Sequence, residues 1–195
     1  MRITYTMAQR TKKGTRKFRL TVDLARIFNR VMTNKSPDVR RALRSKLTDV
    51  SVKRAFALNA IELITKRTLA GKDVNGECFA KYSKGYKESA EFKIYGKSAT
   101  KVNLKLTGEM LASMVSKPKA GTSIVLEFID ADNNNKAHGH TFGGGVKNSL
   151  PIRDFFNLTS DEENDLLTDI LKESSIEQDV NALADFFALA LDDLL

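Results

Sequence analysis

Two histidines, His138 and His140, are the residues best suited to metal chemistry, and the chain contains no other histidine. On an extended strand, side chains two residues apart point to the same face, so both imidazoles could share a metal ion with Asp130 or Asp132. A metal site needs three or four fixed donors, however, and no further donor follows at a recognisable spacing. We therefore expect neither a metal site nor a cofactor.

Nucleophilic catalysis and phosphate binding are poorly supported by the remaining candidates. Cys78 is the only cysteine and lacks the surroundings of a catalytic thiol, so we expect a buried or half-buried ordinary residue. The glycine run that begins at Gly143 lacks the G-x-x-x-x-G-K-[ST] spacing of a phosphate-binding loop. The carboxylates between Asp161 and Asp169 stand at the head of an expected helix, where they offset its dipole. These residues predict a protein that is not an enzyme.

The charges are strongly segregated along the chain. Residues 1–60 hold 16 Lys/Arg against 3 Asp/Glu, whereas residues 121–195 hold 4 against 15, and the net charge is +8. Such asymmetry is typical of contact with nucleic acid through the basic end. It equally suits copies that pack head to tail, or charged faces that are merely solvated. The candidate contacts with DNA or a partner are Arg10, Lys12, Lys13, Arg16 and Lys17.

Between residues 72 and 95, lysines are interleaved with aromatic residues. The aromatic residues of this segment that could stack on single-stranded bases are Phe79, Tyr82, Tyr86 and Phe92. The alternative is that they anchor an irregular segment onto a helix. We favour anchors, because a loop of this length inside a compact domain needs such contacts to be ordered.

The length and composition fit one domain with appendages. The chain has 195 residues, of which 42% are hydrophobic and 29% are charged, and no stretch approaches the ~20 apolar residues of a membrane span. We expect a basic N-terminal arm over residues 1–20, an α+β domain over residues 21–172, and a C-terminal amphipathic helix over residues 173–195. No membrane association is expected.

Helical spacing dominates the domain. Ser36 can cap a helix that has Pro37 in its first turn, and Gly71 is a natural end for the long helical stretch. Thr159 and Ser160 stand three residues before Glu162 and Glu163, which is a doubled capping-box signature. We expect helices over residues 21–34, 36–70 with a break near 48–51, 107–115, 159–172 and 176–194.

The β structure is predicted to be small. Residues 123–129 are β-branched and apolar enough for a strand, and residues 101–106 form a possible second one. Residues 130–135 are expected to be a polar turn, 143–145 a flexible break and 150–156 an extended segment. The predicted fold class is α+β, with a long helix and terminal helices packed on a small antiparallel β-sheet.

Three segments, taken in order, resemble a known family. They run from Arg67 through "GKD" to the "YS" at residues 82–83, from Leu106 through "TGEMLASM", and from Lys136 through "HGHTFG" to the "PIRDFFNLT" at residues 151–159. This succession resembles the virion-morphogenesis, or tail-completion, family of contractile-tailed phages of the Mu and P2 type. The resemblance covers residues 61–171, and Asn157 departs from it where the family usually has glycine. The basic arm, the first helices and the last helix lie outside it.

The resemblance implies a virion structural protein rather than an enzyme. Its implied partners are further copies in a homo-oligomeric ring, the connector or adaptor, the tail tube and packaged DNA. Its implied location is the neck or tail of the virion, and the host cytoplasm during assembly. A basic nucleic-acid-binding protein is the alternative. The motif residues are Gly71, Lys72, Asp73, Gly76, Phe79, Tyr82, Thr107, Gly108, His140, Phe142, Gly143, Pro151, Arg153 and Phe155.

Several motif residues also have an expected structural part. Gly71 and Gly76 permit turns, and Thr107 caps a helix. Pro151 should stiffen an extended segment in which Arg153 points outward while Phe155 or its neighbour packs inward.

Overall fold

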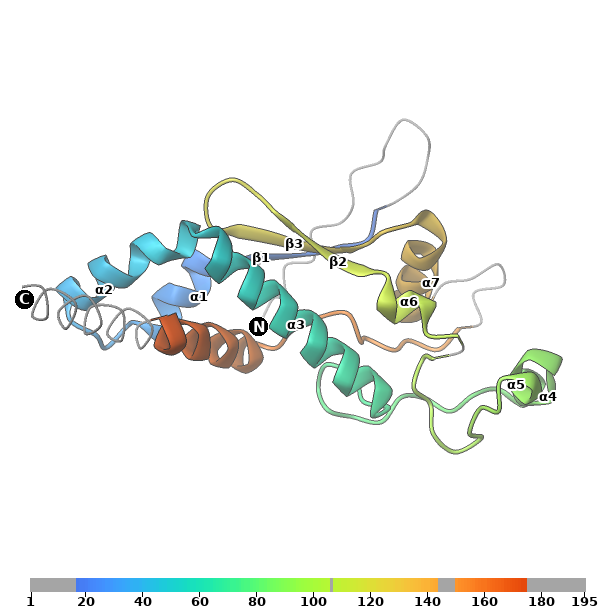
Figure 1. The fold of residues 1–195 in the computed structure, drawn as a ribbon. Helices are drawn as coiled ribbons and strands as arrows, with labels where there is room; N and C mark the ends of the chain where they lie inside the picture. Colours follow the sequence, from blue (N-terminus) through green and yellow to red (C-terminus); the bar gives the residue numbers. More distant parts are fainter. Residues whose placement is uncertain (1–16, 106, 144–149, 175–195) are drawn as a thin grey trace, which may run out of the picture.

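The computed structural model describes residues 17–105, 107–143 and 150–174. Within this part, three antiparallel strands form one sheet in the order β1-β3-β2. They are β1 (Arg19–Asp23), β2 (Met114–Pro118) and β3 (Ser123–Phe128). Figure 1 shows the long helix α3 (Val50–Leu69) running across the sheet. The predicted α+β class with a small antiparallel sheet is confirmed.

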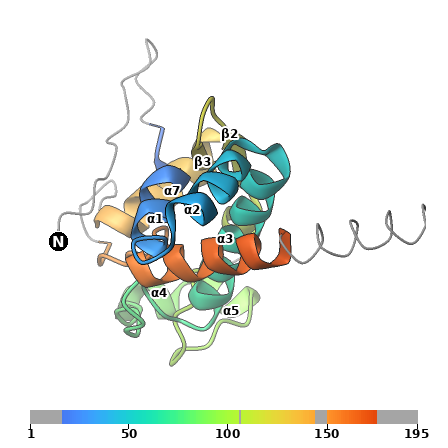
Figure 2. The same cartoon turned by 90° about the vertical axis from the view of Figure 1, so that its left-hand side faces the viewer.

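The other helices are short and surround this centre. They are α1 (Leu24–Val31), α2 (Pro37–Arg44), the 3-10 helix η1 (Ser45–Thr48), α4 (Lys84–Glu88), α5 (Ala90–Ile94), α6 (Glu109–Ala112), α7 (Ala131–Phe142) and a helix over residues 160–174. Figure 2 shows α1, α2 and the 160–174 helix gathered around one end of the molecule, while α4 and α5 project from the opposite end in Figure 1. No helix of the described part is both long and apolar enough to cross a membrane.

Several helix boundaries follow from the expected capping residues. The hydroxyl of Ser36 accepts from the backbone N–H of Val39, as predicted for the start of α2. The break predicted near residues 48–51 is confirmed, because η1 ends at Thr48 and α3 begins at Val50. The capping box is also confirmed: Thr159 Oγ1 accepts from Glu162 N at 3.1 Å, and Glu162 Oε2 accepts from Thr159 N at 2.8 Å.

Side chains of the central strand, β3, alternate between the two faces of the sheet. Ile124, Leu126 and Phe128 belong to the hydrophobic core. Glu127 alternates to the other face, where it pairs with Arg19 at 2.7 Å and with Lys117. Burial acts to raise the pKa of Glu127, but the hydrogen bond from Lys117 and the charges of Arg19 and Lys117 hold it below its ordinary value. The carboxylate therefore ties both edge strands to the centre.

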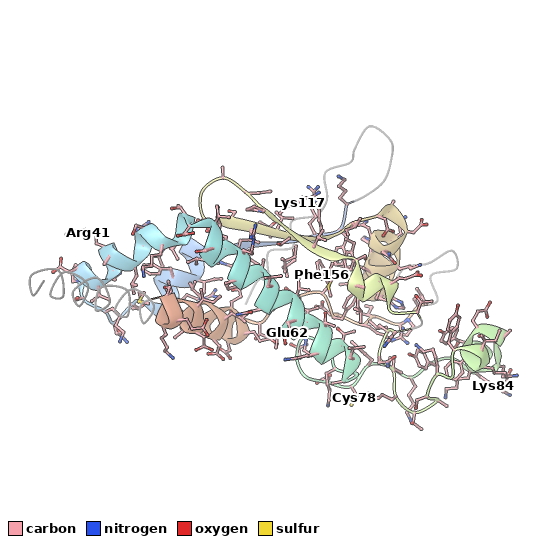
Figure 3. The ribbon with its side chains drawn as sticks, viewed as in Figure 1. Arg41, Glu62, Cys78, Lys84, Lys117 and Phe156 are labelled. Atoms are coloured by element: carbon pink, nitrogen blue, oxygen red, sulfur yellow. The ribbon has the colours of Figure 1, made fainter. Side chains whose placement is uncertain are left out.

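The core lies between α3 and the sheet, and it is rich in aromatic rings. Phe28, Phe56, Phe155 and Phe156 are almost fully buried. Figure 3 shows Phe156 inside the molecule, between the helices and the sheet. Its ring centroid lies 4.7 Å from that of Phe128 and 5.2 Å from that of Phe18. The extended segment after Leu150 is thus an internal part of the fold.

Ion pairs hold the chain that follows this segment. Arg67 of α3 donates to Glu162 and to the carbonyl oxygens of Phe155 and Asn157, the latter two at 3.1 and 2.6 Å. On the next residue, the buried carboxylate of Glu163 accepts from Arg26 and Arg30. These acidic residues therefore have structural partners, in addition to their place near a helix start.

Three elements differ from the sequence prediction. The helix expected from Thr21 is wrong at its start, because residues 19–23 form β1 on the edge of β3 and the helix begins at Leu24. The helix expected over 107–115 is only α6, since the chain enters β2 at Met114. The polar turn expected over 130–135 is wrong: Asp130 caps α7 by accepting from Asn133 N at 2.8 Å. Long-range pairing and capping overrode the local pattern.

Smaller differences concern the loops. The segment after Gly71, which was expected to be an irregular loop, contains two short helices, α4 and α5. The possible strand over 101–106 is absent from the described residues 101–105. Cys78 is exposed rather than buried, because it follows a tight turn at the surface. The expectations for residues 1–16, 144–149 and 175–195, including Arg10, Lys12, Lys13 and Arg16, lie outside the described residues.

Gly71 occupies a position that only glycine fits. Its φ is +83°, and a Cβ atom there would lie 2.7 Å from the carbonyl oxygen of Val102. Gly71→Ala is expected to lower the free energy of unfolding by roughly 3 kcal/mol, through the left-handed backbone and the clash together. Gly76 is the matched control, since its φ is +78° but a Cβ would meet nothing within 4 Å. Urea denaturation of both variants measures this, and equal losses would contradict a steric role for Val102.

Candidate functional site

A pocket of about 600 Å³ lies at the C-terminal end of α3, between α6, α7 and the segment that leads into α4. Residues from segments far apart in the sequence line it. Six of them are residues of the family motifs: Tyr82, Thr107, Gly108, His140, Pro151 and Arg153. The fold therefore gathers the resembling segments around one pocket.

Arg153 lies beneath the pocket rather than on the surface. It is only 4% exposed, so the prediction that it points outward is wrong. Its guanidinium donates to the carbonyl oxygen of Ala80 at 3.1 Å and lies 5.7 Å from the ring centroid of Tyr82. Burial lowers the pKa of Arg153, while Tyr82 and Tyr86 act to raise it. A long-range carbonyl partner, invisible in the sequence, makes this burial possible.

His140 is held in its neutral form. Burial, and then the charges of Arg153 and Lys97, lower its pKa from 6.5 to about 4. Its Nδ1 is buried and has no hydrogen-bond partner among the described residues. The described residues place neither a carboxylate that would orient it nor a nucleophile beside it, so they do not give this imidazole the arrangement of a general base.

The two histidines do not form a metal site. Both lie on α7 rather than on a strand, and residues two apart on a helix do not face each other. His138 instead packs against Phe18 and Phe142, with ring centroids at 5.8 and 4.8 Å. No group of three or more potential metal ligands occurs in the part of the chain that the structure describes.

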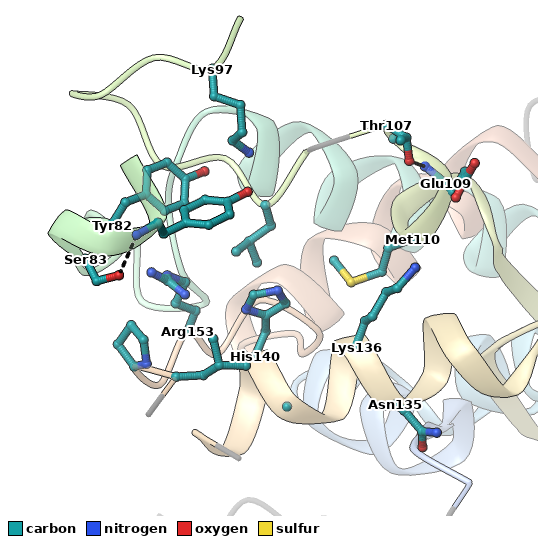
Figure 4. Close-up of a pocket in the computed structure, with 16 residues that line it drawn as sticks. Tyr82, Ser83, Lys97, Thr107, Glu109, Met110, Asn135, Lys136, His140 and Arg153 are labelled. Atoms are coloured by element: carbon teal, nitrogen blue, oxygen red, sulfur yellow. Dashed lines mark hydrogen bonds between the residues drawn. The ribbon is translucent and has the colours of Figure 1, made fainter. Parts of the chain in front are cut away.

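Tyr82, Tyr86 and Phe92 form an aromatic cluster on one side of the pocket. Their ring centroids lie 5.2 to 5.6 Å apart. Tyr82 and Phe92 are nearly buried, and the Tyr82 hydroxyl accepts from the backbone N–H of Asn103 at 3.4 Å. Figure 4 shows how the Tyr82 ring lies over Arg153 and below Lys97. The rings therefore pack on one another and against the segment around Asn103, and their interpretation as anchors stays a prediction.

The polar lining of the pocket is mainly basic. Lys97 lies 5.0 Å from the Tyr82 centroid and donates to the carbonyl oxygen of Lys105 at 2.6 Å. Lys136 reaches the pocket from α7, and Arg153 forms part of its floor. Glu109 is the single carboxylate among the described residues that line it. Sequence analysis did not mention Lys97, and it gave Lys136 only as the first residue of a resembling segment, because neither has a local signal that distinguishes it from other surface lysines.

Exposed apolar side chains occur on two segments that contribute to the pocket lining, and one of them, Leu150, lines the pocket itself. Leu150 lines its edge and is 39% exposed, and Ile152, two residues on, is 68% exposed. Phe142, at the end of α7, is also exposed. Ile152 lies close to Gly143, since a Cβ added there would be 2.9 Å from Ile Cγ1. Phe142, Leu150 and Ile152 are called the apolar rim below.

Other motif residues stabilise the backbone near the pocket. Asp73 Oδ1 accepts from the backbone N–H groups of Asn75 and Glu77, which closes the turn at Gly76. The turn is tied to the third segment, because Val74 N donates to Asp154 O at 2.8 Å.

Each of the other motif residues has a local place. Gly143 ends α7 with φ of +71°. Thr107 accepts from Glu109 N at 3.3 Å, although Gly108 is the capping residue of α6. Lys72 and Cys78 pair through an isolated antiparallel β-bridge. Phe79 and Phe155 are buried, whereas Lys17 is exposed.

No family model, curated protein or solved structure matches this chain.

Because His140 is neutral in the folded protein, we expect the stability of the fold to depend on pH. In the unfolded chain a histidine binds a proton below about pH 6.5, whereas folded His140 stays neutral to about pH 4. The unfolded state therefore binds more protons in this window, and stability falls as the pH falls from 6.5 to 4. The loss attributable to His140 is roughly 3 kcal/mol at full titration. Urea denaturation of the natural chain and of His140→Gln between pH 4 and 8 checks this, and a pH profile unchanged by the substitution would contradict it.

Proposed function

We propose that the chain is a structural assembly protein of a tailed bacteriophage, which self-associates into a ring at the neck or tail end. The observation that carries this proposal is the gathering of the motif residues around one pocket that lacks a reacting centre. His140 is held neutral and Arg153 is engaged with a backbone carbonyl. A pocket of this kind suits binding of another chain better than catalysis.

The surface around the pocket supports an interface. The apolar rim exposes large side chains on two segments that contribute to the pocket lining, and adjacent exposed apolar groups rimmed by polar ones are typical of protein contacts. Ile94, at the end of the projecting α5, is also highly exposed. In the proposed ring, these groups face a neighbouring copy.

The charge distribution supports the same arrangement. A ring around DNA can turn the basic arm toward the lumen, while the acidic end of each copy meets basic surface on the next. The proposed further partners are the connector or adaptor and the tail tube, in the virion and in the host cytoplasm during assembly.

The proposal is tested by assembly and location. The purified chain should form one closed oligomer, which light scattering after size exclusion and electron microscopy of stained particles would detect. In phage particles, cryo-electron microscopy should place the chain at the neck or tail end. A chain that stays monomeric at all accessible concentrations, and is absent from particles, would overturn the proposal.

A nucleic-acid-binding protein is the second candidate, and α2 is the observation that favours it. This helix has no buried residue and carries Arg40, Arg41 and Arg44. If the ring proposal holds, DNA binding by the isolated subunit should be weak, about 10⁻⁴–10⁻⁶ M at physiological salt. Arg40→Glu, Arg41→Glu, Arg44→Glu combined should lower this binding further and leave assembly intact. Fluorescence anisotropy with duplex and single-stranded DNA measures the affinity of the natural chain and of the triple variant. Tight DNA binding by the natural monomer that is abolished in the triple variant would favour the nucleic-acid-binding function.

A further inference from the structure

The pocket combines an apolar lining with cations, which identifies the chemistry of what it binds. Lys97, Lys136 and Arg153 surround apolar groups such as Leu104 and Met110. A small inorganic anion would leave the apolar lining uncovered, and a purely apolar segment would bring no carboxylate to the three cations, whose charge Glu109 alone does not balance. The matching ligand is therefore a peptide segment that is both apolar and acidic.

One segment of this chain has that composition. Residues 175–195 contain five Asp/Glu and no Lys/Arg. Their apolar residues recur at three- and four-residue steps: Ile176, Val180, Leu183, Phe187, Leu191 and Leu194. We propose that the pocket receives residues 175–195 of a second copy of the chain, an inference that rests on the proposed self-association.

The pocket and Ser174 lie at opposite ends of α3, which favours a second copy as the source of the segment. Ser174 O accepts from Lys46 Nζ at 3.2 Å, which places residue 174 beside η1, at the start of α3. The pocket lies at the other end of α3, where Asn103 contacts Tyr82. A helix of 20 residues separates the two places, which corresponds to ~30 Å at 1.5 Å per residue. Figure 1 shows the end of the 160–174 helix and the pocket elements at opposite ends of the molecule.

The distance between Ser174 and the pocket determines how copies would pack. Each copy carries the start of the acidic segment at one end and the receiving pocket at the other. Contacts between two different surfaces repeat from copy to copy, and they close into a ring when the rotation between copies allows it. The acidic segment meeting Lys97, Lys136 and Arg153 also favours this order of packing over a symmetric face-to-face contact.

Site-specific cross-linking in the full chain tests the inference. Leu150→p-benzoylphenylalanine places a photoreactive group at the partly exposed edge of the pocket. Copies with this substitution are made in ¹⁵N and mixed with natural-isotope chain before illumination, and the cross-linked peptides are analysed by mass spectrometry. We expect cross-links from ¹⁵N residue 150 to natural-isotope peptides within residues 175–195. Leu58→p-benzoylphenylalanine, on the exposed face of α3, is the control and should not give them.

The other outcomes separate this inference from the proposed function. Oligomers whose cross-links to residues 175–195 are confined to one isotope would show that each copy uses its own segment, which overturns the inference but not the ring. Oligomers cross-linked at 150 only to other regions would also overturn the inference alone. A chain that remains monomeric overturns both.

Competition gives an independent measurement on the unmodified chain. A synthetic peptide of residues 175–195, added in excess to the assembled full chain, should dissociate it by occupying the pockets. A peptide of the same composition in scrambled order is the control, because it keeps the charge but not the apolar spacing. Assembly that is insensitive to the natural peptide, or equally sensitive to both, would overturn the inference.

Discussion

Arg67→Met is expected to lower the free energy of unfolding by about 3 kcal/mol, because it removes the partner of a partly buried carboxylate and of two carbonyl oxygens at once. In the natural chain Arg67 donates to Glu162, Phe155 O and Asn157 O. These contacts tie α3 to the segment that carries Arg153 and leads into the 160–174 helix. Urea denaturation followed by circular dichroism measures the loss.

The neighbouring residue supplies a matched control. Lys66 forms an ion pair with Glu62 at 2.6 Å, but its side chain is 74% exposed. Such a surface pair contributes only about 0.3–0.5 kcal/mol, so Lys66→Met should change the stability little. Similar losses of unfolding free energy in the two variants would mean that the buried contacts of Arg67 do not stabilise the fold.

The sequence predicted the elements whose signals are local. Ser36 and the capping box at Thr159 contain both partners of their hydrogen bonds within four residues, and both were found as expected. The break before α3 and the left-handed Gly71 at its end are likewise properties of a few adjacent residues. These signals need no knowledge of the rest of the chain.

The elements that were missed depend on distant partners. β1 pairs with β3 more than a hundred residues away, as Arg19 lies opposite Glu127. In α7, adjacent asparagines have low helix propensity. One of their contacts is distant, since Asn134 Oδ1 accepts from Phe18 N, 116 residues earlier, at 2.8 Å. The other is local: Asn133 Nδ2 donates to the capping residue Asp130, a signal that the sequence analysis overlooked. A periodicity argument cannot see either bond.

The candidate site was predictable in its residues but not in its geometry. The motif segments indicated Tyr82, His140 and Arg153, yet their mutual contact requires the whole fold. Arg153 is a charged residue in an extended segment and was therefore expected at the surface. Its burial follows from the carbonyl of Ala80 and the ring of Tyr82, which lie 73 and 71 residues earlier. Those contacts place its charge beneath the pocket.

Ile152→Glu is expected to weaken self-association by roughly 30- to 100-fold while leaving the fold intact. The side chain is 68% exposed and belongs to the apolar rim, so the monomer loses little when it becomes polar. In an assembled ring the same position would bury a carboxylate against apolar groups. A substitution at such an interface position can cost about 2 kcal/mol or more of association free energy. A loss of about 2.7 kcal/mol corresponds to a 100-fold change in the association constant.

The control and the alternative outcome locate the interface. Leu58→Glu alters a similarly exposed apolar residue, 58% exposed on the outer face of α3 and away from the pocket. Sedimentation velocity over a concentration series should show the natural association constant for this variant and a much lower one for Ile152→Glu. Loss of assembly in the Leu58 variant alone would move the contact surface to α3. Because both substitutions add one negative charge, a difference between them reports on position rather than on net charge.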